Sequence, residues 1–427
     1  TDNLLAFMAV YNLLAFLAVY LKRSGIEFVD EVMDTVLCPD LKADLKLRDY
    51  QEDALSTWFR SGKRGVIVLP TGSGKTVIGI EAISLCNVSS LVVVPTLDLM
   101  DQWKQRLEGE FNVEVGSYGG GSHELQGITV STYDTAYLRA EELGNQFALI
   151  IFDEVHHLPA PGYSNIAEMF ASPYRLGLTA TYEREDGLHK ELPRLVGGKV
   201  FEMEVKELAG KHLANYDLEL IRTELTPDEK REYDENYGEY LNYLRATRIK
   251  IKTPRDFQRF IMRTGTDPKA RKALLARHRA KSIALNSFSK IHVLRDLLAK
   301  HSGSRMLIFT QHNELVHRIS REFLIPSITH KTAKDERREN LDRFRDGRYG
   351  TLVTSKVLDE GVDVPEANIG VILSGSGSTR EYRQRLGRLL RKKDGKRAIL
   401  YEIVSRGTSE VGTSRRRHTP VAKKLRG

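Results

Sequence analysis

A glycine-rich segment between two apolar runs places the strongest constraint on how this chain folds. Residues 69–76 read LPTGSGKT, with an apolar run at 65–68 before them and a helix-compatible run at 77–83 after them. This order predicts a buried strand that turns into a helix at a loop whose backbone N–H groups point inward. Lys75 can span outer phosphates, and Thr76 Oγ can meet Mg²⁺. The loop residues expected to hold a nucleoside triphosphate are Thr71, Gly72, Ser73, Gly74, Lys75 and Thr76.

One position departs from the general phosphate-loop pattern. That pattern has glycine five positions before the glycine of the Gly-Lys pair, where this chain has Leu69. The alternative is a glycine-rich surface turn with a solvated lysine. The motifs described below disfavour that alternative, because they supply the other groups that nucleotide hydrolysis needs.

Length and composition suit a multidomain globular protein. The 427 residues exceed one core of ordinary size and suit two α/β domains with an insert. A hydrophobic content of 41% and a charged content of 29% argue against disorder on a large scale. The net charge of +8 favours a polyanionic partner only weakly, because a solvated basic surface gives the same count.

The cysteine count excludes several site classes. Cys38 and Cys86, the two cysteines of the chain, cannot form a disulfide framework, a four-cysteine zinc site or a cysteine-ligated iron–sulfur cluster. We therefore expect a reducing, intracellular setting: cytoplasmic and nucleoid-associated, or nuclear in a eukaryote. A duplicated apolar segment, NLLAFMAVY followed by NLLAFLAVY at 3–20, barely reaches the length of a membrane span. Polar residues interrupt it, so we expect a buried or interface helix and no membrane partner.

Apolar runs alternate with helical patterns from residue 49 onward, which predicts parallel α/β sheets. The expected strands of the first series are 65–69, 91–95, 128–131, 148–152 and 175–179, and those of the second are 306–310, 351–355, 369–374 and 398–403. Residues 214–289 show no strand signal and are charged and tyrosine-rich, so they fit either a solvated helical linker or an insert that grips nucleic acid. The predicted divisions are an N-terminal helical remnant or linker (1–46), a first domain (47–213), a helical insert (214–289), a second domain (290–409) and a basic tail (410–427) that is frayed from residue 415.

The segment IIFDEVHH at 150–157 is an apolar strand that ends in two acids. Asp153 at the strand tip can hold Mg²⁺ opposite Thr76, and Glu154 can orient and deprotonate an attacking water. His156 is expected to couple nucleotide state to the next strand, because adjacent histidines rarely bind one metal ion. The hydroxyls expected to share this coupling follow that strand in LTAT, Thr179 and Thr181.

Further candidate residues lie at both ends of the chain. Arg48 and Gln51 of LRDYQ precede the loop. The Gln51 amide can both donate and accept a hydrogen bond, which suits recognition of adenine. The same segment also fits a helix that begins at Asp49. In QRLGRLLR, Arg388 and Arg391 share a helix face and can stabilise transition-state charge on a γ-phosphate; an ordinary basic helix is the alternative. The remaining candidates are Gln384 and Arg385 for coupling and Gly361 and Asp363 for nucleotide contact.

In order, LRDYQ, LPTGSGKT, VVVPTLDL, VSTYDTA, DEVHH, LTAT, LIFTQHNEL, TSKVLDEGVDVP and QRLGRLLR resemble the motif series of superfamily 2 helicases. DEVHH together with Arg184-Glu185-Asp186 resembles the XPB-type DNA helicases of nucleotide excision repair and transcription initiation. The resemblance covers residues 46 to about 417. It implies two RecA-like parallel-sheet domains in tandem, a thumb-like helical element near 226–282, and a DNA-opening role for Arg184, Glu185 and Asp186.

The resemblance also implies partners, and the chain differs from the family pattern in one respect. Such proteins use ATP and Mg²⁺ to move on duplex or forked DNA, we expect a monomeric motor, and short prokaryotic forms can partner a repair nuclease. We expect only the end of the family's N-terminal damage-recognition domain here, from about Ser24, which weakens the expectation that this chain discriminates damage. The lack of a long acidic or low-complexity extension favours an archaeal or bacterial type. Two rivals stay open: an RNA helicase of the DEAD or DEAH kind, and an ATP-regulated scaffold that binds nucleic acid for a partner nuclease.

Overall fold

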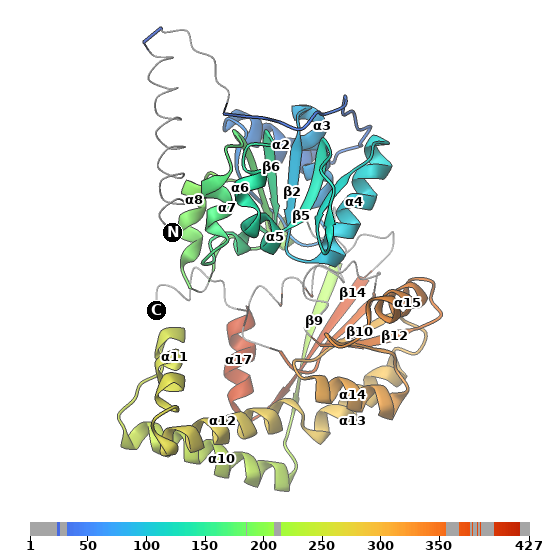
Figure 1. Ribbon diagram of the computed structural model, residues 1–427. Coiled ribbons are helices and arrows are strands. Elements are labelled where there is room, and N and C mark those ends of the chain that lie inside the picture. Colours follow the sequence, from blue (N-terminus) through green and yellow to red (C-terminus); the bar gives the residue numbers. More distant parts are fainter. Residues whose placement is uncertain are drawn as a thin grey trace. The chain divides into compact units, whose positions relative to one another are not determined.

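Two α/β units make up the chain, with the division between Leu208 and Ala209 (Figure 1). The computed structural model describes residues 24–25, 32–184, 186–208, 215–355, 367–375, 378, 382, 385 and 397–418. Each unit is built on a sheet whose strands are parallel apart from one short hairpin. This confirms the predicted parallel-sheet fold class.

The first unit contains an eight-stranded sheet. Its order is β4 (Ser122–His123), β3 (Gly116–Gly119), β5 (Ile128–Thr132), β2 (Ser90–Val94), β6 (Leu149–Asp153), β7 (Tyr174–Thr179), β1 (Arg64–Val68) and β8 (Lys199–Glu202). The central strands β2 and β6 are buried on both faces and consist mainly of valine, isoleucine and leucine, as is usual in parallel sheets. The strand order makes β6, β7 and β1 neighbours, so the segments DEVHH, LTAT and LPTGSGKT all begin at one edge of the sheet.

Short helices connect the strands of the first unit. They are α2 (Asp49–Arg60), α3 (Lys75–Cys86), α4 (Leu97–Phe111), α5 (Tyr133–Leu138), α6 (Ala140–Leu143), α7 (Ser164–Met169), α8 (Leu192–Leu195) and α9 (Val205–Leu208), with 3₁₀ turns η1 (Val155–His157) and η2 (Leu188–Glu191). Ahead of α2, an extended segment packs on this unit, since Asp34 N donates to Asn145 O at 3.1 Å and Ala43 N to Ser84 Oγ at 3.0 Å. The duplicated segment at 3–20 lies outside the described residues.

The second unit contains a six-stranded sheet, and the sequence did not predict two of its strands, β11 and β9. Its order is β11 (Ser327–Ile328), β12 (Thr351–Thr354), β10 (Met306–Phe309), β13 (Ile369–Ile372), β14 (Arg397–Ser405) and β9 (Asn215–Thr223). The expectation of no strand in 214–289 was wrong, because β9 pairs in parallel with β14 over nine residues. Edge position explains the weak signal: Leu218 and Leu220 are exposed, and charged residues alternate with them.

Three helices follow β9 within the stretch that was predicted to be helical. They are α10 (Pro227–Ala246), α11 (Pro254–Arg263) and α12 (Pro268–Leu285), and α10 packs along α12 (Figure 1). Pro227 at the first position and a capping box between Thr226 and Glu229 explain where α10 begins. The tyrosines of α10 largely serve packing, since Tyr233 and Tyr240 are buried. Further helices of this unit are α13 (Phe288–Lys300), α14 (Asn313–Phe323) and α15 (Lys334–Arg345).

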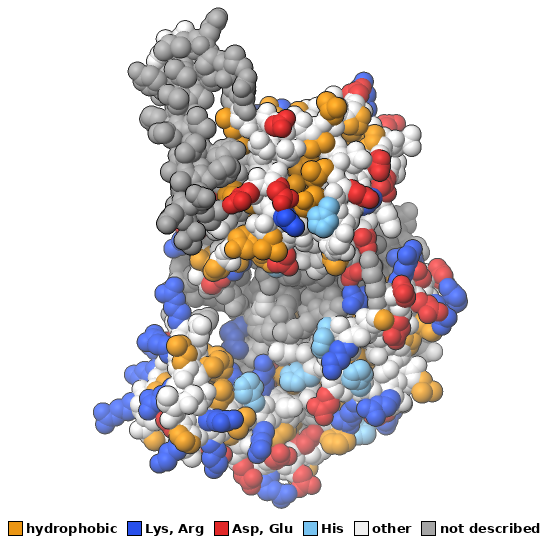
Figure 2. All heavy atoms as spheres, viewed as in Figure 1, with side chains coloured by type: hydrophobic (Ala, Val, Ile, Leu, Met, Phe, Trp, Pro, Cys, Tyr) orange, Lys and Arg blue, Asp and Glu red, His pale blue; other side chains and the backbone are white. Residues whose placement is uncertain are grey.

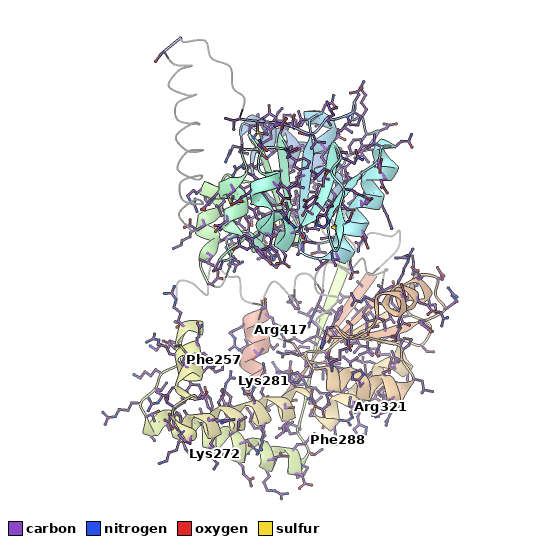
Figure 3. All side chains as sticks on the ribbon, viewed as in Figure 1. Phe257, Lys272, Lys281, Phe288, Arg321 and Arg417 are labelled. Carbon is purple, nitrogen blue, oxygen red and sulfur yellow. The ribbon has the colours of Figure 1, made fainter. Side chains whose placement is uncertain are left out.

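The expectation that the tail is frayed from residue 415 was wrong as far as residue 418, because residues 409–418 form helix α17 (Ser409–His418). Arg417 of α17, which Figure 3 labels, pairs with Glu402 of β14, and both side chains are buried. Lys290 of α13 contacts both oxygens of Glu410 at 2.7 Å, and this pair is also buried. A buried charge needs a partner, so these ion pairs hold the basic helix against the sheet. Charge counting along the sequence could not reveal that partners existed.

The nine strands expected from apolar runs all occur, with ends shifted by no more than two residues. Within the described ranges, no helix is both long and apolar enough to span a membrane.

Candidate active site

The glycine-rich loop has the strand-to-helix placement that the sequence predicts. It leaves β1 after Val68 and enters α3 at Lys75. Gly72 and Gly74 both have φ of 84°, a left-handed conformation that side chains other than glycine rarely adopt. A Cβ on Gly74 would lie 2.6 Å from Gln51 Nε2, so a side chain at this position would also displace the Gln51 amide.

The polar groups of the loop fit a bound phosphate. Thr71 Oγ1 and Ser73 Oγ are buried, and neither has a hydrogen-bond partner among the described atoms. Lys75 Nζ lies 3.4 Å from Leu69 O, the geometry of a lysine folded back along its own loop. Thr76 follows in the first turn of α3. Buried donors without partners are costly, and a phosphate group would satisfy them.

Helix α2 holds the loop through Tyr50 and Gln51. Gln51 Nε2 donates to Ser73 O at 3.0 Å, its Oε1 accepts from Arg48 N at 2.9 Å, and Tyr50 OH donates to Ser73 O at 2.6 Å. Both ends of the Gln51 amide therefore bind the chain itself in this structure. Contact of Arg48 and Gln51 with an adenine ring stays a prediction. Tyr50 was missed because an isolated tyrosine carries no signal of its partner.

Asp153, the last residue of β6, is a buried carboxylate with two donors. Trp103 Nε1 donates to its Oδ2 at 2.9 Å, and Glu154 N donates to its Oδ1 at 3.0 Å. Burial and the neighbouring Glu154 charge raise the Asp153 pKa from 3.8 to about 6, although Lys75 and the Trp103 bond oppose the rise. Trp103 comes from α4, and it also meets α3 where a Cβ on Gly79 would clash with its ring. Nothing local in the sequence marks Trp103 as a partner of Asp153.

We expect Trp103 emission to titrate with a midpoint near pH 6 in the metal-free, nucleotide-free protein, since the carboxyl that its indole faces has a pKa of about 6. Folding raises this pKa above its ordinary value of 3.8, so the native state binds the proton more tightly than the unfolded state. The contribution of Asp153 to the free energy of unfolding therefore falls as pH rises from about 4 to about 6.

A Trp103→Phe variant is the control for this titration. It should abolish the change, because Trp58, the second tryptophan of the chain, donates to Arg175 O, away from the carboxylate. Emission of the unmodified protein that stays flat between about pH 4.5 and about 7.5 would contradict the assignment.

Hydrogen bonds connect the DEVHH and LTAT segments. Glu154, at φ 50°, directly precedes the turn η1, and its Oε2 lies 3.3 Å from His156 Nδ1. His156 Nδ1 lies 3.0 Å from Thr179 Oγ1, which in turn accepts from Thr181 N at 3.1 Å. The structure thus brings together the glutamate, the histidine and both threonines. The His157 ring packs against the Tyr133 ring, with 5.9 Å between the two ring centres. Among the described residues, no group of three acidic, histidine or cysteine side chains could hold a metal ion by itself.

The triplet that follows LTAT is partly described. Arg184 Nη1 donates to His156 O, and its Nε and Nη2 donate to the two oxygens of Asp186 at 3.0 and 2.6 Å. Glu185 lies outside the described residues.

Of the candidates in the second unit, Arg385 is described. Its side chain is buried, and its guanidinium carbon lies 5.3 Å from the centre of the Phe309 ring. This contact joins the QRLGR segment to the end of β10 within the second unit. The other candidates lie outside the described residues: Gly361, Asp363, Gln384, Arg388 and Arg391.

Two family models match the chain, one in each unit. Residues 44–184 match the model described as "Type III restriction enzyme, res subunit", and residues 289–393 match "Helicase conserved C-terminal domain". Among solved structures, the Hef helicase domain of Pyrococcus furiosus has a TM-score of 0.55 and 19% identity, covering 86% of this chain and 97% of that chain. This likeness concerns the fold, and it confirms the expected pair of RecA-like domains in tandem.

Relatives in sequence are named XPB. "DNA 3'-5' translocase XPB2" of Sulfurisphaera tokodaii is 47% identical over 98% of this chain and 94% of that protein. "DNA 3'-5' helicase XPB" of Mycobacterium tuberculosis is 32% identical over 86% of this chain and 62% of that protein. In Saccharomyces cerevisiae, the "general transcription and DNA repair factor IIH helicase/translocase subunit XPB/SSL2" is 29% identical over 89% of this chain and 44% of that protein. By its similarity to these proteins and by its ordered motifs, the chain belongs to the XPB family of superfamily 2 helicases.

Proposed function

We propose that this chain is an ATP-driven DNA translocase that opens duplex DNA in nucleotide excision repair, with transcription initiation as a second setting. The observation that carries the proposal is the hydrogen-bonded set Glu154, His156 and Thr179 beside a phosphate-binding loop. The relatives' names give a 3'-5' direction, and the same direction is proposed here.

Each residue of the first unit has a distinct task in this proposal. Lys75 and the loop N–H groups hold the outer phosphates, and Thr76 and Asp153 hold Mg²⁺. When bound, Mg²⁺ neutralises phosphate charge. Glu154 orients the attacking water and takes up its proton. Its backbone is left-handed, and its side chain lies beside His156, which holds the carboxylate in place for this role. His156, Thr179 and Thr181 pass the change at the nucleotide to the chain beyond β7.

Hydrolysis needs the second unit in this proposal. Arg388 and Arg391 supply positive charge to the transition state, Gly361 and Asp363 contact the nucleotide, and Gln384 and Arg385 couple its state to the second sheet. The burial of Arg385 against Phe309 supports a coupling role over direct contact with phosphate. Alternate closing and opening of the two units would move the chain along DNA.

Cationic side chains of the helical insert are proposed to contact DNA phosphates. Figure 2 shows Lys and Arg side chains gathered at the helical end of the second unit. The exposed cations of this region include Lys252, Arg255, Arg259, Arg263, Lys269, Arg271, Lys272 and Arg279. Phosphate contacts carry no sequence information, so binding should tolerate any sequence and weaken steeply with salt. A repair nuclease is proposed as the protein partner.

ATP hydrolysis with different nucleic acids tests this function. We expect duplex or forked DNA to stimulate turnover, single-stranded RNA to stimulate it far less, and the apparent DNA affinity to fall between two salt concentrations. Greater stimulation by RNA would favour the DEAD or DEAH alternative. Salt-sensitive DNA binding without any nucleic-acid-dependent turnover would favour the scaffold alternative.

A further inference from the structure

Arg184 connects two loops that the sequence treats as separate. Its Nη1 donates to the backbone oxygen of His156, while its Nε and Nη2 bind both oxygens of Asp186 at 3.0 and 2.6 Å. The Arg184 side chain is 18% exposed, so much of it is withdrawn from solvent. A guanidinium can bridge two groups in this way because its donors form a rigid planar fork.

The carbonyl that Arg184 binds lies within the turn that positions the catalytic glutamate. His156 belongs to η1, which begins directly after Glu154. The imidazole of His156 is 3.3 Å from Glu154 Oε2 and 3.0 Å from Thr179 Oγ1. Displacement of the His156 backbone would therefore move the imidazole and disturb its contact with the glutamate.

Asp186 holds the guanidinium at the angle that this contact needs. Its Oδ1 also accepts from Leu188 N at 3.1 Å, which ties the carboxylate to the turn η2. The Arg184 bonds and the Leu188 N–H lower the Asp186 pKa, as expected for an ionised carboxylate with several donors. In addition, Arg184 N donates to His189 Nδ1 at 3.1 Å. Contacts within its own loop thus fix the position of Arg184, independently of its bond to η1.

We infer that Arg184 is a positioning residue for ATP hydrolysis: held by Asp186, it steadies the His156 carbonyl and thereby the Glu154 side chain. The inference rests on the proposed hydrolytic role of Glu154. It differs from a role in strand opening alone, under which Arg184 and Asp186 could be replaced with little loss of hydrolysis. It also links the loop assigned to DNA opening with the site of hydrolysis inside the first unit.

The test compares kcat for ATP hydrolysis at saturating ATP, measured without DNA and extrapolated to saturating duplex DNA. Arg184→Ala should lower both values by about 10-fold or more, which is the rate equivalent of one lost charge-assisted hydrogen bond, with the KM for ATP changed by less than about 3-fold. Arg184→Lys should lose most of the same rate, because an ammonium cannot bridge the carbonyl and the carboxylate. Asp186→Ala should act in the same direction, and the double variant should be no slower than Arg184→Ala.

Two further measurements separate positioning from a damaged fold. Guanidinium ion at millimolar concentration should restore part of the rate of Arg184→Ala and none of the rate of Arg184→Lys. Glu183→Gln is the matched control, since Glu183 adjoins Arg184 and its contact with Lys199 is a distant 3.8 Å; its kcat should equal that of the unmodified protein.

The inference is overturned if Arg184→Ala keeps the kcat of the unmodified protein, or if it loses rate only when DNA is present. Those results would restrict Arg184 to DNA contact. By contrast, an unmodified protein that does not hydrolyse ATP at all would overturn the proposed function itself, so the two failures are distinguishable.

Discussion

Replacement of Glu154 by glutamine is expected to lower kcat for DNA-stimulated ATP hydrolysis by about 10²–10⁴-fold, the usual contribution of a general base. The amide keeps the size of the carboxylate and can still accept a hydrogen bond, but it cannot take up the proton of an attacking water. The loop around Lys75 is untouched, so ATP affinity should stay within a few-fold of that of the unmodified protein. Phosphate release and equilibrium nucleotide binding, measured on the same preparation, check both expectations.

A matched control uses an acid remote from this chemistry. Glu141 of α6 is exposed, so Glu141→Gln should hydrolyse ATP at the unmodified rate. If Glu154→Gln releases phosphate as fast as this control, the hydrolytic assignment fails and the scaffold alternative gains support.

Replacement of Arg417 by alanine is expected to destabilise the second unit by about 3–5 kcal/mol, because it removes the guanidinium that pairs with the buried Glu402 carboxylate. The loss should also free the carbonyl of Gly375, to which Arg417 Nη2 donates at 2.7 Å. Both tryptophans, Trp58 and Trp103, lie in the first unit, so tryptophan emission reports that unit alone. Hydrogen exchange of peptides from β14 and α17 measures the expected loss in the second unit.

Arg416 provides the neighbouring control. It is exposed on the same helix, and Arg416→Ala should change the opening free energy of these peptides by no more than about 0.5 kcal/mol. An Arg417→Met, Glu402→Leu double variant should recover most of the loss, since it removes both buried charges. Unchanged exchange in Arg417→Ala would mean that α17 does not depend on this ion pair.

Much of the fold and of the site follows from local sequence patterns. Apolar runs of four to six residues predicted the central strands of both sheets, because a strand buried on both faces must be apolar throughout. The loop ahead of Lys75 could be placed between strand and helix because glycine permits its backbone angles. Asp153 and Glu154 were found for the same kind of reason, as acids at the end of an apolar strand.

Pairings between distant residues could not be predicted in this way. Trp103 lies 50 residues from the carboxylate to which it donates, and Lys290 lies 120 residues from Glu410. The edge strand β9 was missed because its exposed face carries charges, and the bond from Arg184 to His156 was missed because it joins two loops.

Sequence alone thus determined the strand-rich cores, the phosphate loop and the acidic strand end, since each depends on the conformational preference or burial of consecutive residues. Tertiary structure alone decided which carboxylate is raised in pKa, which arginine donates to the turn after Glu154 and which tail residues are buried. These properties depend on desolvation and on partners brought close by packing, and no short segment encodes either one.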